Sequence, residues 1–182
     1  MTVSILFLLG SAILLVISWR PLLNPRSHGF YRFFAWETLW IMFLLNAGGW
    51  FHDPLSWNQL VSWGLLLASL VLVIQGLRLL REIGRQDQTR NDPALLGMEK
   101  TSRLVTVGLY RHIRHPLYSS LLFLAWGLFF KSPSWLEAGL AGLATLLLTA
   151  TALVEERENI NTFGDDYVEY MKHSKMFIPF LF

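Results

Sequence analysis

The feature that most constrains this chain is a series of five long apolar stretches separated by polar segments. A helix needs about 20 consecutive apolar residues to cross the hydrocarbon core of a bilayer, and the stretches are near that length. They cover roughly residues 2–19, 33–51, 60–80, 116–130 and 135–154. The sequence therefore predicts an all-α integral membrane protein with five transmembrane helices, folded as a single domain over residues 1–182.

Composition supports a lipid environment. Charged residues make up 15% of the 182 residues and apolar residues 53%, whereas a soluble domain carries about 25% charged residues. The chain has no cysteine, which excludes disulfides, thiolate metal sites and a cysteine nucleophile. The sequence pI of about 9.1 favours an anionic membrane surface over nucleic acid, because the basic residues flank the apolar stretches and form no single stripe. The first stretch lacks a basic start and has Arg20-Pro21 where a signal peptide would be cleaved.

The distribution of Lys and Arg predicts the orientation. Fourteen of these 15 residues lie in the first loop, the third loop and the C-terminal tail, and only Lys131 lies in the fourth loop. With five spans, the first loop, the third loop and the tail share one side of the membrane. By the positive-inside rule that side is the cytoplasm, so the N-terminus lies outside and the C-terminus is cytoplasmic.

The polar residues gather at the start of the fourth stretch, in "GLYRHIRHPLYSS" at 108–120. Pro116 suits the first position of a helix and leaves His115 as its cap. The free amides of that first turn, with Arg111 and Arg114 just before them, favour an anion. Arginine and tyrosine also anchor span ends at the interface, which is an alternative interpretation. A metal pair of His112 and His115 is disfavoured because no thiolate or carboxylate is near in sequence, so no metal is predicted.

A second polar stretch, "EERENINTFGDDYVEY" at 155–170, ends the fifth span on the same side. Glu155 and Glu156 lie near a helix C-terminus, where the helix dipole disfavours carboxylates. They therefore need a partner, and the basic run at 111–115 is available. The pairing is either a structural ion pair or a shared site for a ligand that carries both charges. Beyond it, Tyr167 and Tyr170 share one face of a predicted amphipathic helix that lies on the bilayer.

These two stretches resemble the isoprenylcysteine carboxyl methyltransferase and phospholipid methyltransferase family of integral membrane enzymes. The matching motifs are "LVTVGLYRHIRHPLYSS" and "EERENINTFGDDYVEY", which together span residues 104–170. The resemblance implies S-adenosylmethionine as methyl donor and a cofactor-binding half at about 81–182. The residues that it implies for the cofactor pocket are Arg103, Leu104, Val105, Tyr110, Arg114, His115, Pro116, Tyr118 and Glu155.

The resemblance also implies in-line transfer of the methyl group to a lipophilic acceptor that arrives from the lipid. A carboxylate acceptor needs no base, whereas an amine must lose a proton, for which His115 or Glu156 is the candidate. The prenylcysteine branch of the family is expected to have an arginine about one turn before the Glu pair, and this chain has Thr151 there. A lipid amine or another small lipophilic acceptor is therefore favoured over a prenylcysteine carboxylate.

Two other functions fit parts of the pattern. Sterol-type membrane reductases that use NADPH have a similar Arg-His-x-x-Tyr element, but the 2′-phosphate of NADPH favours clustered arginines where this chain has Glu155 and Glu156. A membrane scaffold or transporter subunit would use the polar cluster only to join its helices. The oligomeric state stays open.

Overall fold

The computed structural model describes residues 2–51, 53–84 and 101–179. Its elements are α1 (Thr2–Leu22), α2 (His28–Asn46), α3 (Trp57–Ile83), the short 3₁₀ helix η1 (Gly108–Arg111), α4 (Pro116–Lys131), α5 (Trp135–Phe163) and α6 (Asp165–His173). An isolated parallel β-bridge joins Ile113 and Lys175. The predicted all-α class is confirmed.

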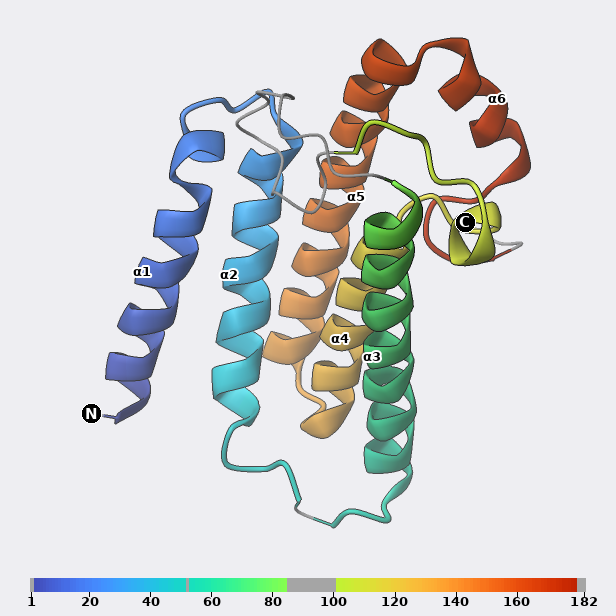
Figure 1. Ribbon diagram of the computed structural model, residues 1–182. Coiled ribbons are helices and arrows are strands. Elements are labelled where there is room, and N and C mark those ends of the chain that lie inside the picture. The colour runs from blue at the N-terminus through green and yellow to red at the C-terminus, as the bar shows by residue number, and fades with distance from the viewer. Residues whose placement is uncertain (1, 52, 85–100, 180–182) are drawn as a thin grey trace.

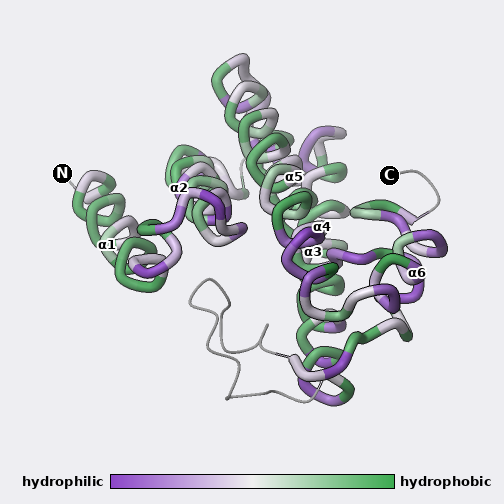
Figure 2. Tube along the Cα trace, turned by 90° about the horizontal axis from the view of Figure 1, so that it is seen from above, coloured by the Kyte–Doolittle hydropathy of each residue, from purple (hydrophilic) through white to green (hydrophobic). Residues whose placement is uncertain are grey.

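The five long helices run side by side, and α6 lies across one end of the bundle (Figure 1). The contacts between helices give the order α1, α2, α5, α4, α3. The N-terminus of α4 and the C-termini of α3 and α5 reach the same end, next to α6 (Figure 1). Polar residues concentrate there (Figure 2). The two sequence motifs, which are far apart in the chain, therefore meet at one end of the bundle.

Three helices, α1, α3 and α5, are long and apolar enough to cross a membrane by length and composition, and α4 is a shorter apolar helix. Many of their large apolar side chains face outward, such as Leu8, Leu67 and Leu146, as expected of helices that contact lipid. These apolar helices with outward-facing apolar side chains indicate an integral membrane protein. Of the five predicted spans, these three reach the length and hydropathy of a bilayer crossing.

Helix α2 covers His28–Asn46, so it begins and ends earlier than the predicted second span at 33–51. The sequence placed Arg32 in a loop, which is wrong: it lies in α2 with 2% of its surface exposed. Its guanidinium lies 5.0 Å from the Trp36 ring and 3.4 Å from His28. His28 in turn contacts Glu158 of α5 at 2.5 Å. Polar contacts within the protein thus let α2 begin earlier than its apolar run.

The core consists of two clusters of buried apolar residues between α2, α4 and α5. One contains Leu39, Met42, Ala125, Leu128, Ala141 and Ala144. The other contains Ala35, Tyr118, Leu148, Ala152 and Phe177, and it lies directly below the polar end of the bundle. Small residues on α5 let α2 and α4 approach it closely, as in other helical membrane proteins. This packing holds the start of α4 and the end of α5 against each other.

Candidate functional site

A cleft opens where the two motifs meet. Its walls come from the end of α3, residues 101–105, η1, the start of α4, the end of α5 and α6. The lining residues are Leu80, Thr101, Leu104, Val105, Tyr110, Arg114, His115, Pro116, Leu117, Tyr118, Glu155, Asn159, Phe163, Tyr167 and Tyr170. Both motifs thus contribute to a single cleft.

The start of α4 has the predicted cap. His115 is the N-cap residue and Pro116 is the first residue of the helix. The C-terminal tail fixes this turn, because the backbone N–H groups of Arg114 and His115 donate to Lys175 O and Met176 O at 2.7 and 3.1 Å. Those two amides are therefore occupied. The first helical turn has no side-chain cap, so its amides remain available as donors next to the cleft lining.

The chain before η1 turns sharply at Gly108, whose φ of +61° favours glycine. A Cβ atom at this position would also lie 2.8 Å from Leu79 of α3, closer than side chains approach. The glycine therefore lets η1 pack directly on α3. This contact brings Tyr110, which is 7% exposed, into the wall of the cleft.

Arg114 and Glu156 form a buried ion pair. The Nε atom of Arg114 donates to Glu156 Oε1 at 2.7 Å, and the two side chains are 10% and 7% exposed. The Nη1 atom of Arg114 donates to the carbonyls of Met171, at 3.3 Å, and Ser174. The predicted contact between the glutamate pair and the basic run is confirmed, and it also ties α6 to α5.

Glu155 has different neighbours from Glu156. Its Oε2 atom accepts a hydrogen bond from the Tyr118 hydroxyl, and His115 Nδ1 lies 4.0 Å away. The rings of His115 and Tyr118 stack with centroids 5.4 Å apart, so the predicted convergence of these residues is confirmed. The His115 Nε2 atom lies 3.4 Å from Glu156 Oε1, a distance for an ion pair rather than a well-formed hydrogen bond. His115 therefore lies between both carboxylates.

Two tyrosines of α6 cover the cleft. Tyr167 and Tyr170 are 2% and 9% exposed, and their rings lie 5.8 Å apart edge to face. The Tyr170 hydroxyl donates to Tyr110 O at 2.5 Å. Burial raises the pKa of both hydroxyls well above the ordinary value, so they stay protonated. The prediction that this aromatic face lies on the bilayer is wrong, because both rings are buried in the protein, where they line the cleft.

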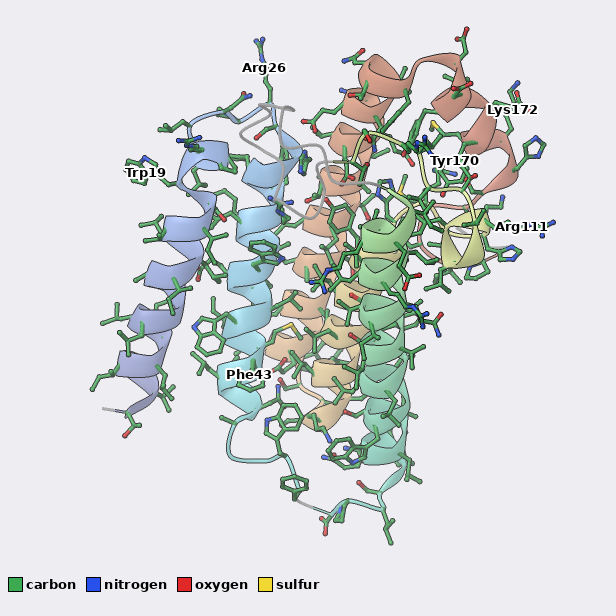
Figure 3. All side chains as sticks on the ribbon, in the orientation of Figure 1. Trp19, Arg26, Phe43, Arg111, Tyr170 and Lys172 are labelled. Carbon is green, nitrogen blue, oxygen red and sulfur yellow. The ribbon has the colours of Figure 1, made fainter. Side chains whose placement is uncertain are left out.

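Figure 3 shows Tyr170 directed inward from α6, whereas Lys172 and Arg111 point away from the bundle. Arg111 and His112 are exposed and do not line the cleft. Within the described ranges, no group of three His, Asp or Glu side chains is arranged to hold a metal ion. The residues that converge on the cleft are thus carboxylates, Arg114, His115 and tyrosines.

Most of the residues that the resemblance implied lie around this cleft. Those that line it are Leu104, Val105, Tyr110, Arg114, His115, Pro116, Tyr118 and Glu155. Arg103 is exposed and outside the lining, and Glu156 is buried behind it. The structure adds lining residues that the sequence analysis did not assign to the pocket, namely Leu80, Thr101, Leu117, Asn159, Phe163, Tyr167 and Tyr170. Helical spacing could have indicated Asn159 and Phe163, which follow Glu155 at intervals of four.

The fold and the cleft define an integral membrane protein with a charged, tyrosine-lined site at one end of its helical bundle. The chain belongs to the phospholipid methyltransferase family, whose profile matches residues 57–166. That match covers α3 to the start of α6 and confirms the family predicted from the two motifs. The family is one of methyltransferases, in agreement with the predicted enzyme class.

The chain is also similar to methanethiol S-methyltransferase 1 of Bradyrhizobium diazoefficiens. The two are 33% identical over 88 residues, which cover 47% of this chain and 30% of the relative. The matched region thus spans about a third of that protein's length. No solved structure matches the chain.

Proposed function

We propose that this protein transfers the methyl group of S-adenosylmethionine to a lipophilic acceptor at the membrane interface. The observation that carries the proposal is Glu155, which lines the cleft with no Lys or Arg partner among the described residues. Arg114 meets Glu156 instead. The cleft therefore offers a ligand the negative charge of Glu155. It also offers positive groups at the start of α4, among them Arg114.

The residues present fit the methyl donor. Glu155 suits a cationic group, and the carboxylate end of the donor suits the helix start at Pro116. Arg114 adds positive charge there, because its Nη2 atom makes no hydrogen bond to the described residues. The apolar side chains of Leu104, Val105 and Pro116 supply a surface for a flat ring. When bound, the donor supplies a methyl group activated by the positive charge on its sulfur.

Arg103 is proposed as a rim residue that meets the donor only at the mouth of the cleft. It follows Thr101, which lines the cleft, and its side chain is exposed. Its expected contribution is therefore a long-range charge that salt screens. The side chains that line the cleft carry the specificity for the donor.

His115 is proposed as the group that takes a proton from an amine or thiol acceptor. It is 5% exposed and lines the cleft between Glu155 and Glu156. Glu156 is proposed to hold the imidazole in place, since it lies behind the lining. The chain otherwise aligns acceptor and donor and excludes water, which contributes most of the acceleration in methyl transfer between bound partners.

The acceptor is proposed to be a lipid amine or another small lipophilic molecule. Thr151 is fully buried, and its hydroxyl donates to Leu147 O at 2.7 Å. It therefore presents no charge to an acceptor carboxylate. The relative in Bradyrhizobium diazoefficiens is named for a small thiol acceptor, which supports a neutral nucleophile here.

The membrane arrangement is part of the proposal. We place five spans, α1 to α5, across the bilayer with the N-terminus outside and the cleft at the cytoplasmic side. The bias of Lys and Arg toward the cleft end supports this orientation. The chain is proposed as one domain over 1–182 with its cofactor-binding half at about 81–182, of which residues 85–100 and 180–182 lie outside the described ranges.

Calorimetric titration of the detergent-purified protein tests the proposal. The ligand is sinefungin, a donor analogue with an amine in place of the sulfonium, and NADPH is titrated separately. We expect micromolar sinefungin binding that weakens about tenfold or more in Glu155→Gln. Glu169→Gln, a control on the exposed face of α6, keeps the affinity of the unmodified protein.

A folded protein that binds neither sinefungin nor S-adenosylhomocysteine contradicts the proposed function. Binding of NADPH in their place would indicate a membrane reductase. Absence of binding by all three ligands would favour a scaffold or transporter subunit.

A further inference from the structure

We infer that Glu155 and the tyrosines around it make the cleft selective for charge, so that it binds the cationic methyl donor more tightly than the neutral product. This inference rests on the proposed function. It assigns a specificity role to four tyrosines, of which Tyr167 and Tyr170 were not expected to meet the donor.

The first observation is the uneven neutralisation of two adjacent carboxylates. Glu156 is 7% exposed and pairs with Arg114 at 2.7 Å. Glu155 is 18% exposed, lines the cleft and accepts a hydrogen bond from the neutral hydroxyl of Tyr118. Only His115 Nδ1, at 4.0 Å, is within ion-pair distance of Glu155 in the described part of the chain. A carboxylate so placed at the edge of a low-dielectric region attracts a cation strongly.

The second observation is the gathering of tyrosines. The chain contains five, and Tyr110, Tyr118, Tyr167 and Tyr170 line this one cleft. Each is less than a tenth exposed. Three of the hydroxyls are engaged within the protein, that of Tyr118 with Glu155, that of Tyr170 with Tyr110 O and that of Tyr167 with Asn159. What these rings offer a ligand is therefore mainly aromatic surface, which attracts cations electrostatically.

The chemistry of the proposed reaction changes the charge at this point. A lone pair of the acceptor forms the new bond to the methyl carbon, and the electron pair of the broken S–C bond stays on sulfur. The sulfonium thereby becomes a neutral thioether, while an acceptor proton passes to His115 or leaves with solvent. The attraction of Glu155 and the aromatic rings for the sulfur position is lost in the same step. The product is then displaced by fresh donor.

The test compares two ligands on the whole protein in detergent, by calorimetry. Sinefungin has a positive charge where the donor has its sulfonium, and S-adenosylhomocysteine has a neutral sulfur. We expect sinefungin to bind at least about tenfold more tightly, equivalent to about 1.4 kcal/mol. The readout is the dissociation constant of S-adenosylhomocysteine divided by that of sinefungin. A general loss of fold weakens the binding of both ligands and leaves this ratio unchanged.

Three variants assign the ratio to particular side chains. Glu155→Gln keeps the shape of the side chain and removes its charge, so the ratio is expected to fall about tenfold. Tyr167→Leu removes a ring and lowers the ratio about threefold or more, whereas Tyr167→Phe preserves it. Tyr31→Leu, which alters the one tyrosine outside the cleft lining, leaves the ratio unchanged.

Equal affinities for the two ligands would overturn the inference and leave the proposed function intact. So would a ratio that persists in both Glu155→Gln and Tyr167→Leu. Should Tyr167→Leu fail to fold, Glu155→Gln and Tyr167→Phe still decide, because neither changes the packing volume by more than one polar atom. Failure of both ligands to bind the unmodified protein would instead reject the proposed function.

Discussion

At the scale of single residues, the adjacent glutamates Glu155 and Glu156 have different surroundings. Glu156 faces Arg114 and lies behind the cleft, whereas Glu155 faces the cleft itself. The difference follows from the 100° turn between successive residues of a helix. The two glutamates share His115 as a neighbour, but only Glu156 meets Arg114, so Glu155 is left without an arginine partner among the described residues and faces the cleft.

The Arg114–Glu156 pair is expected to support the fold of the cleft. Removing one member of a buried pair strands the other and costs about 3–5 kcal/mol, so Arg114→Ala should lower the melting temperature in detergent clearly. Arg78→Ala is the control, since it removes an exposed ion pair with Glu82 at a similar 2.8 Å distance. Equal melting temperatures for the two variants would contradict this prediction.

The tyrosines of α6 predict a pH dependence of stability. Burial raises the pKa of Tyr167 and Tyr170 in the folded protein, whereas in the unfolded chain tyrosine titrates near about pH 10. Below that pH both states are protonated and the stabilisation is complete. Above it the unfolded chain binds fewer protons, so unfolding becomes easier as pH rises toward the folded-state pKa.

Denaturation between pH 8 and about pH 11 measures this effect. The loss of stability above about pH 10 should be smaller in the double variant Tyr167→Phe/Tyr170→Phe than in the unmodified protein. An identical pH dependence of the two proteins would show that these hydroxyls are not responsible.

At the scale of elements, the most extensive contact between two helices is that of α3 with α4. Their backbones approach at Gly127, where the Ser62 hydroxyl donates to the glycine carbonyl at 2.7 Å. A Cβ atom on Gly127 would lie 2.9 Å from a Leu66 side-chain carbon and 3.4 Å from Leu65 Cβ. Close approach of this kind stabilises membrane helices through packing and polar contacts. This contact joins the last turns of α4 to the first turns of α3, at the end of the pair away from the cleft.

Gly127→Leu is therefore expected to separate α3 from α4 and to lower the melting temperature in detergent. The matched control is Gly139→Leu on α5, where no atom lies within 4 Å of an added Cβ. That change is expected to be neutral or slightly stabilising, because leucine favours helix more than glycine does. A Gly127→Leu protein as stable as Gly139→Leu would refute the proposed close packing.

The last residue of α4, at this same end of the helix pair, shows how packing changes the role of a residue. The sequence placed Lys131 in an outer loop, but the side chain is 4% exposed at the end of α4. Its Nζ atom lies 3.4 Å from the centroid of the Trp63 ring and 2.8 Å from Gln59 Oε1. A single lysine in an apolar environment thus finds aromatic and amide partners on α3.

At the scale of the whole molecule, polar residues gather at the end of the bundle that carries α6, its polar end (Figure 2). The cleft, α6 and the tail lie at the polar end, beside the N-terminus of α2. This polarity agrees with the side to which the loops rich in Lys and Arg were assigned.

The proposed orientation predicts the accessibility of engineered cysteines. Because the chain has none of its own, single changes Arg26→Cys, Asp166→Cys and Ser132→Cys each give one reactive thiol at an exposed site. In intact cells a membrane-impermeant maleimide should label Ser132→Cys only, and the other two should react after the membrane is opened. Labelling of Asp166→Cys in intact cells would invert the proposed topology.

The sequence by itself determined the helical class, the membrane environment and the two motifs that make the cleft. Apolar runs and the Pro116 cap act through local geometry, which a pattern along the chain records directly. Even the pairing of the glutamates with the basic run followed from charge, since both lie on one side of the membrane. Eight of the residues expected in the pocket line the cleft for these reasons.

Only the tertiary structure decided which glutamate pairs with Arg114, that Tyr167 and Tyr170 line the cleft, and that Arg32 and Lys131 are buried. Each of these depends on contacts between residues far apart in sequence. A helical pattern shows that a face is aromatic but not whether lipid or protein covers it. That choice is made by the tail and Arg114, which bind α6 back across the start of α4.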